Sequence, residues 1–270
     1  MKYFAKYISI MLIATGCIQT GCKKSIQDPA SGNLSAAEMS KQMAVSLYRS
    51  LSGQYGGANI NDGIKSPLNY IPVEKKRKAN ALNPYCGMFI DTTYNFSETV
   101  SDTVKTYFGH YRFTYGCTNN VLDSYVLDDS IANAVNRDLY EANYKLTQKY
   151  FVKALDQTYK LSSVEGSISF SSHASLFNQA RTNAQYHNSD IYYKLKGVRV
   201  DISSGVADVV QGEAGFTAGI HNLDGTIKVD NNFYGSITFL SNRRARVLIN
   251  LNSETKIYIV NMISGQVTAG

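Results

Sequence analysis

The sequence predicts a mainly β protein, an antiparallel meander that follows a single N-terminal helix. Three observations support this prediction. Segments of alternating apolar and polar residues succeed one another from residue 86 to residue 270, turn sequences rich in Asn, Asp, Gly and Ser separate them, and residues 35–51 have helical apolar spacing. Strands joined by short turns pair antiparallel. We therefore expect one domain, residues 35–270, built as an open curved sheet, a half-barrel or a sandwich that the helix caps.

The predicted helix begins after Ser35, a favoured N-cap residue, and Glu38 stands three residues later, as in a capping box. Gly53 ends it. Residues 53–84 are punctuated by Gly, Asn and Pro and predict an irregular connection. We interpret its basic run, residues 74–78, as a solvated loop in preference to a contact for anionic lipid or polysaccharide. The apolar stripe of the helix, which we expect to pack on the sheet, consists of Met39, Met43, Val45, Leu47 and Leu51.

The strand pattern is clearest in residues 107–115. Their odd positions are aromatic apart from Gly109, and their even positions are mostly polar, which is typical of a strand with one buried face. Residues 118–120 predict a turn, after which residues 124–127 pair back. Residues 137–161 fit both helical and strand spacing, but their frequent Tyr and Thr favour strands.

The last third of the chain contains three similar segments, each with a glycine that we interpret as opening an alternating strand: residues 165–170, 224–229 and 234–239. Asp224-Gly225 is a strong hairpin signal, because a type I′ turn requires positive φ. Further turns are predicted at residues 230–232, 241–242 and 252–253, with strands at residues 244–251 and 256–263.

Two cysteines, Cys86 and Cys117, lie in the predicted domain. An even number of cysteines in an exported chain favours a disulfide, and closing a loop of 31 positions would stabilise the fold by at most about 3.7 kcal/mol. Two free thiols or a metal pair are the alternatives. Neither cysteine has a histidine or another cysteine at metal-ligand spacing.

The beginning of the chain has the pattern of an export signal that ends in a lipidation cysteine. Lys2 and Lys6 precede a short apolar segment, residues 8–14, whereas spanning a bilayer takes roughly 20 apolar residues. Cys17 and Cys22 are both candidates for acylation, and a cleaved signal without lipid is a further alternative.

We favour Cys22 as the acylated residue. Lys23-Lys24-Ser25 follows it, although Ala14 gives Cys17 the better upstream context. Residues 1–21 are then the signal peptide and residues 22–34 a polar tether. Acyl chains would hold the protein in the envelope of a Gram-negative bacterium, at the periplasmic face or the cell surface.

Charge and residue types narrow the function classes. Without residues 1–21, which contain two lysines and no acidic residue, the net charge falls from +6 to +4. This excess is mild, whereas nucleic-acid binding requires a clustered basic face, so we expect no nucleic-acid partner. Twenty tyrosines without tryptophan suit half-buried strands, and a sugar-binding surface is the alternative.

The sequence contains no recognisable motif of a reaction centre. It contains no Gly-x-Ser-x-Gly elbow and no phosphate-binding glycine loop. Asp128 and Asp129 would point to opposite faces of a strand, and we interpret them, with Asp208 and Glu213, as turn or surface acids. We therefore assign no catalytic, metal-binding or cofactor-binding residue. Zinc-motif spacing is absent from the four histidines, His110, His173, His187 and His221.

The chain resembles cell-envelope lipoproteins of Bacteroidota-type bacteria. The resemblance is carried by residues 21–25 (Gly-Cys-Lys-Lys-Ser), by the capped helix after the tether and by the glycine-containing strands of the last third. It implies a membrane-anchored envelope protein and transfers no catalytic residue.

Three functions follow as hypotheses. The first is a non-catalytic binding or structural role at the membrane, with an envelope protein, a glycan or a lipid as partner. The second is a periplasmic carrier of a lipid or other apolar ligand, which predicts a dry groove lined by Val247, Ile249 and Ile257. The third is a glycan-active enzyme with two carboxylates roughly 5–10 Å apart. It is less favoured because the sequence shows no recognisable reaction centre.

Overall fold

The computed structural model describes residues 34–64, 84–180, 182–224 and 227–270 of the chain. The proposed signal, the tether up to residue 33, with Cys17 and Cys22, and the basic run at residues 74–78 lie outside the described residues. The helical elements are α2 (Ala36–Leu51) and the short 3₁₀ helix η1 (Ile60–Asp62). The strands are β1 (Phe89–Val100), β2 (Thr103–Thr118), β3 (Val121–Arg137), β4 (Tyr140–Ala154), β5 (Leu161–Phe177), β6 (Asn183–Asp201), β7 (Asp208–Asp224), β8 (Ile227–Leu240), β9 (Arg244–Leu251), β10 (Glu254–Asn261) and β11 (Val267–Ala269).

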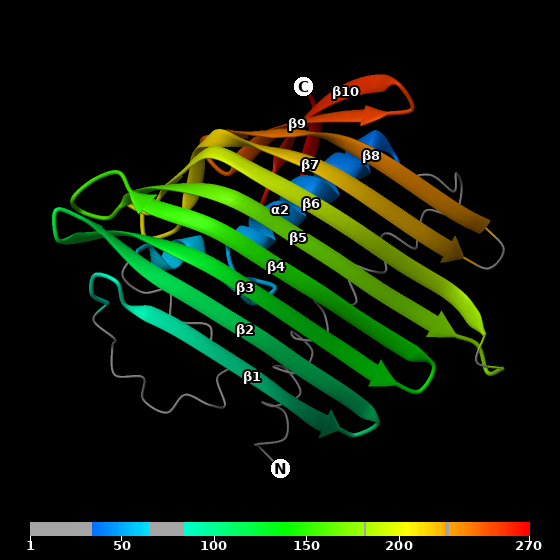
Figure 1. The fold of residues 1–270 in the computed structure, drawn as a ribbon. Coiled ribbons are helices and arrows are strands. Elements are labelled where there is room, and N and C mark those ends of the chain that lie inside the picture. Colours follow the sequence, from blue (N-terminus) through cyan, green and yellow to red (C-terminus); the bar gives the residue numbers. More distant parts are fainter. Residues whose placement is uncertain (1–33, 65–83, 181, 225–226) are drawn as a thin grey trace, which may run out of the picture.

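All the described strands form one antiparallel sheet in which every strand pairs with its neighbours along the chain, in the order β1 to β11. The sheet is open, with β1 and β11 at its two edges, and Figure 1 shows its long strands side by side with α2 lying across one face. The predicted antiparallel meander with an N-terminal helix is therefore confirmed, as an open curved sheet. Residues 137–161 contain β4, so the strand interpretation of this segment is confirmed as well.

Helix α2 covers one face of the sheet, here called the helix-covered face. The Ser35 side chain accepts a hydrogen bond from the backbone N–H of Glu38, as expected of an N-cap, while the Glu38 carboxylate pairs with Lys41. The helix is held to the sheet by polar contacts as well as by apolar packing, because the Tyr193 hydroxyl donates to the carbonyl of Met43 at 3.0 Å. No helix in the described ranges is long and apolar enough to cross a membrane.

Buried and exposed side chains alternate along the strands. The buried ones lie on the helix-covered face, and the exposed ones lie on the opposite face, here called the helix-free face. In β2, Tyr111, Phe113 and Tyr115 are buried, and the residues between them, such as Arg112, are exposed. The predicted faces of residues 107–115 are confirmed. The aromatic and branched side chains of many long strands together form a large apolar core. Removing this apolar surface from water is the main favourable contribution to folding.

Tight turns between strands use the residue types that the sequence offers. Asn119 and Asn120, between β2 and β3, both have positive φ, as do Asn252 and Ser253 between β9 and β10. This is the backbone of a type I′ hairpin. The turn between β8 and β9 is also held from outside, since the Asp208 carboxylate accepts hydrogen bonds from two of its backbone N–H groups at 2.8 and 2.9 Å.

Two predictions about the last third are wrong. Residues 230–232 do not form a turn but lie inside β8, where the exposed carboxylate of Asp230 pairs with His221 and Lys228. Gly166 and Gly235 do not open strands but lie inside β5 and β8. A Cβ at either glycine would come within 1.9 Å of a carbonyl oxygen of the neighbouring strand, so these glycines allow a close approach of two backbones.

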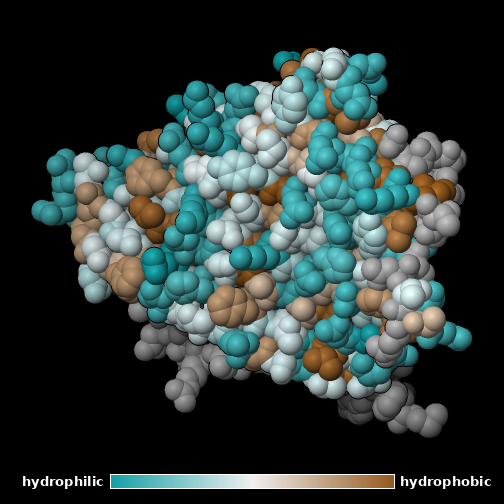
Figure 2. Space-filling model, turned by 45° about the vertical axis from the view of Figure 1, so that its right-hand side comes forward, coloured by the Kyte–Doolittle hydropathy of each residue, from teal (hydrophilic) through white to brown (hydrophobic). Residues whose placement is uncertain are grey.

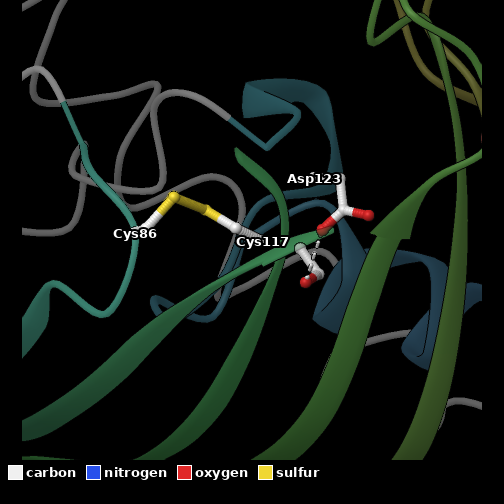
Figure 3. Close-up of a disulfide and its surroundings, with 4 residues drawn as sticks. Cys86, Cys117 and Asp123 are labelled. Carbon is white, nitrogen blue, oxygen red and sulfur yellow. Dashed lines mark hydrogen bonds between the residues drawn. A yellow bond between two sulfur atoms is a disulfide. The ribbon is translucent and has the colours of Figure 1, made fainter. Parts of the chain in front are cut away.

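The predicted disulfide between Cys86 and Cys117 is formed, and the free-thiol and metal-pair alternatives are wrong (Figure 3). It joins the segment that precedes β1 to the end of β2, with the two Cα atoms 5.5 Å apart. Beside it, Asp123 of β3 accepts a hydrogen bond from Ser124. The bond closes a loop that contains β1 and nearly all of β2 and thereby holds the edge of the sheet in place.

Candidate functional site

A shallow groove of about 700 Å³ lies on the helix-free face, across the middle of β4 to β8. This volume is within the range of small-molecule sites, roughly 300–1,000 Å³. Figure 2 shows this side of the molecule as mainly hydrophilic, with small hydrophobic patches between the polar side chains. Most of the groove lining belongs to the helix-free face: Lys145, Thr147, Ser169, Ser171, Asp190, Tyr192, Thr217, Gly219, His221, Asn232 and Tyr234.

The groove arises from an alternation of small and large side chains between neighbouring strands. On this face β5 presents Ser169 and Ser171, and β7 presents Thr217 and Gly219. The strands between and beside them carry larger groups. Because adjacent strands are about 4.8 Å apart, a strand with small side chains between two strands with large ones becomes the floor of a trough.

Two tyrosines stand on either side of the β7 floor. The register pairs Tyr192 of β6 with Thr217, and Thr217 with Tyr234 of β8, so the two tyrosines share one row of the sheet. Two strand spacings place their Cα atoms about 10 Å apart. Tyr192 is 43% exposed and Tyr234 61%, and within the described ranges neither has a hydrogen-bond or ring partner. Many other aromatic rings of the sheet are buried in its core, although Phe89, Phe108 and Phe151 are also exposed.

Polar groups extend over the same floor from β7 and β8. A methyl group placed on Gly219 would lie 3.1 Å from Oδ1 of Asn232 and 3.3 Å from Nε2 of His221. The other ring nitrogen of His221, Nδ1, is hydrogen-bonded to the Asp230 carboxylate at 2.8 Å, which fixes the direction of the ring. This hydrogen bond, together with that from Lys228, lowers the pKa of the exposed Asp230 carboxyl.

A second polar cluster is buried on the helix-covered face, around Asp129. This carboxyl is 1% exposed, and its register neighbours are Tyr111 and Gln148. Burial raises its pKa well above the ordinary value, although the backbone N–H groups of Ala58 and Gln148 act in the opposite direction. Neither carboxyl oxygen makes a hydrogen bond of ordinary geometry to the described residues.

Gln148 connects this cluster to the helix and to the loop after it. Its side chain donates to the carbonyl of Ser50 at 2.9 Å and accepts from the N–H of Ala58 at 2.7 Å. Gly57 lies against both side chains, since a Cβ at this position would be 2.3 Å from Oε1 of Gln148 and 3.0 Å from Oδ2 of Asp129. The cluster thus joins the end of α2 to the centre of the sheet.

The other candidate residues occupy separate places. Asp128 and Asp129 lie on opposite faces, as predicted, but the interpretation of Asp129 as a turn or surface acid is wrong because it lies in the core. Asp208 does hold a turn. The four histidines are dispersed, and within the described ranges no three His, Cys, Asp or Glu side chains gather as a metal site would require.

The groove expected for a lipid carrier is not formed by the residues proposed for it. Val247 and Ile249 are 0% and 1% exposed, on the helix-covered face. Ile257 pairs with Leu248, so it belongs to the opposite face, where it is 40% exposed. Among the described lining residues of the observed groove, Asp190 is the one carboxylate, so the pair required for glycoside hydrolysis is not found there.

Sequence reasoning missed the groove itself. Its signal was present as two strands with small residues at alternate positions, Ser167 to Ser171 and Gly215 to Gly219, and as tyrosines on the strands beside them. Recognising it requires the register, which the sequence does not specify. Comparisons of the chain with protein-family models, curated proteins and solved structures found no match.

Proposed function

We propose that this protein is a lipid-anchored binding protein of the bacterial envelope, acylated at Cys22, that holds a ligand non-catalytically in the groove of its helix-free face. The observation that carries the binding role is the groove over strands that are paired on both sides, with two exposed tyrosines beside it that have no hydrogen-bond or ring partner among the described residues. The export signal and the Gly-Cys-Lys-Lys-Ser sequence support the location.

A binding role suits the rest of the molecule. The groove is positioned by strands whose opposite side packs in the core, so its side chains stand on a rigid base. The disulfide supports an oxidising compartment, where such bonds persist. Roughly a dozen tether residues, residues 22–34, would reach at most about 40 Å from the acylated cysteine, which keeps the groove near the membrane surface.

Native mass spectrometry of the full chain, purified in detergent from its own envelope, tests both parts of the proposal. We expect a covalent mass increase from acyl chains that the Cys22→Ser variant lacks. We also expect a non-covalent ligand that the Thr217→Arg variant loses, because a long side chain between Tyr192 and Tyr234 fills the groove. Thr217 is exposed, so its replacement is expected to leave the core intact.

Two results would contradict the proposal. A mature protein that lacks both Cys17 and Cys22 and carries no acyl mass would exclude the anchor. A bound ligand that the Thr217→Arg variant retains at full occupancy would place the binding site elsewhere.

A further inference from the structure

We propose that the ligand of the groove is a glycan, bound with sugar rings against Tyr192 and Tyr234. This inference rests on the proposed function and names the ligand class of the same site. The two tyrosines are exposed and share one row of the sheet, on either side of a floor of Thr217 and Gly219. A pyranose has an apolar face of C–H groups, which packs on an aromatic ring, and a rim of hydroxyl groups.

The polar lining is suited to that rim. Asp190 and Asn232 stand in the row next to the tyrosines, and His221 lies one row further along β7. The Nε2 atom of His221 is directed over Gly219 by the contact of its other nitrogen with Asp230. Ser169 and Ser171 of β5 add hydroxyl groups on the other side of β6. Such a lining offers hydrogen-bond donors and acceptors in several directions, as a ligand with many hydroxyl groups requires.

The same geometry disfavours a peptide. An extended peptide usually binds a sheet by adding a strand at a free edge, where backbone N–H and C=O groups are available. The groove lies over β4 to β8, all of which have a paired neighbour on both sides. Their backbone groups are used within the sheet, so recognition here depends on side chains.

A lipid is disfavoured by the composition of the lining. On the helix-free face of the groove, the rings of Tyr192 and Tyr234 are the large apolar side chains, and the remaining side chains are hydroxyl, amide, imidazole or charged, apart from glycine. The other apolar residues of the lining are buried at positions that face the core: Phe170, Ile191, Ala218 and Phe233. An acyl chain needs a continuous apolar surface, because the free energy of its burial grows with the apolar area removed from water.

A glycan array probed with the detergent-solubilised full chain tests the inference. The probes are β-glucans, mannans, xylans, pectins, glycosaminoglycans and peptidoglycan fragments. We expect binding to at least one class, weakened at least about 10-fold by Tyr192→Ala or Tyr234→Ala, as for aromatic residues that carry binding energy. Tyr192→Phe and Tyr234→Phe, which keep the ring, are expected to retain most of the affinity.

Phe151→Ala is the matched control. Phe151 lies on the helix-free face of β4 outside the groove lining and is 44% exposed, close to the 43% of Tyr192, so its loss removes a similar exposed ring. We expect this variant to bind like the wild type. Binding to no glycan class, or binding that the two alanine variants do not weaken, would overturn the inference. If native mass spectrometry still detects a ligand that Thr217→Arg removes, the binding function stands and the glycan assignment alone falls.

Discussion

Replacing Asp129 by asparagine is expected to stabilise the protein increasingly as the pH rises above about 4. Burial raises the pKa of this carboxyl above its unfolded value, which is about 3.9. Between the two pKa values the folded state holds a proton that the unfolded state has lost. The wild type therefore loses up to about 1.4 kcal/mol of stability for each unit of pH, until the folded pKa is reached. Asparagine keeps the shape and does not ionise.

Urea unfolding of the wild type and the Asp129→Asn variant at pH 4, 5, 6 and 7 measures this difference. We expect the two free energies of unfolding to diverge with pH in favour of the variant. Asp128→Asn is the control. Asp128 is the preceding residue and lies on the helix-free face, where it pairs with Lys149. Substitutions of such surface residues have small effects on stability. Parallel pH profiles for the wild type and Asp129→Asn would show that the buried carboxyl is not protonated in the fold.

Removing the disulfide is expected to destabilise the protein by up to about 3.7 kcal/mol. The bond closes a loop across a sequence separation of 31, and opening it restores conformational freedom to the unfolded chain. The loop contains β1, an edge strand that pairs with β2 alone. The loss should therefore appear as weaker protection of the β1–β2 hairpin as well as a lower free energy of unfolding.

The double variant Cys86→Ala/Cys117→Ala provides the measurement, because it removes the bond without leaving a reactive thiol. Its free energy of unfolding is compared with that of the wild type under oxidising conditions, and then with both proteins in a reducing agent. We expect the difference to become much smaller on reduction. A loss below about 1 kcal/mol under oxidising conditions would mean that the packing of β1 on β2, not the bond, holds this edge.

Local patterns predicted much of this fold. The N-cap at Ser35, the alternation in residues 107–115 and the turn at Asn119-Asn120 depend on neighbours within a few positions, and each is found in the structure. Residues 230–232 show where such reasoning fails. Three polar residues in succession favour a turn, but pairing with β7 keeps them in a strand, where Asp230 contacts His221. Tertiary pairing outweighs local preference there.

The two polar sites depend on distant pairing and so could not be predicted. Asp129 and Gln148 belong to different strands, and Gly57 approaches them from the loop after the helix. The groove needs the register of five strands, because a shift of one residue moves every side chain to the other face. The groove predicted for a lipid carrier shows this limit, since the prediction grouped Ile257 with Val247 although the register separates them.

The central claim is that the groove of the helix-free face is the binding site, and photocrosslinking in the native envelope tests it most directly. The photoreactive residue p-benzoylphenylalanine is placed at position 192, within the groove, or at position 151, outside it on the same face. We expect illumination to attach an envelope component from position 192 and not from position 151. Equal attachment from both positions, or attachment from position 151 alone, would contradict the claim.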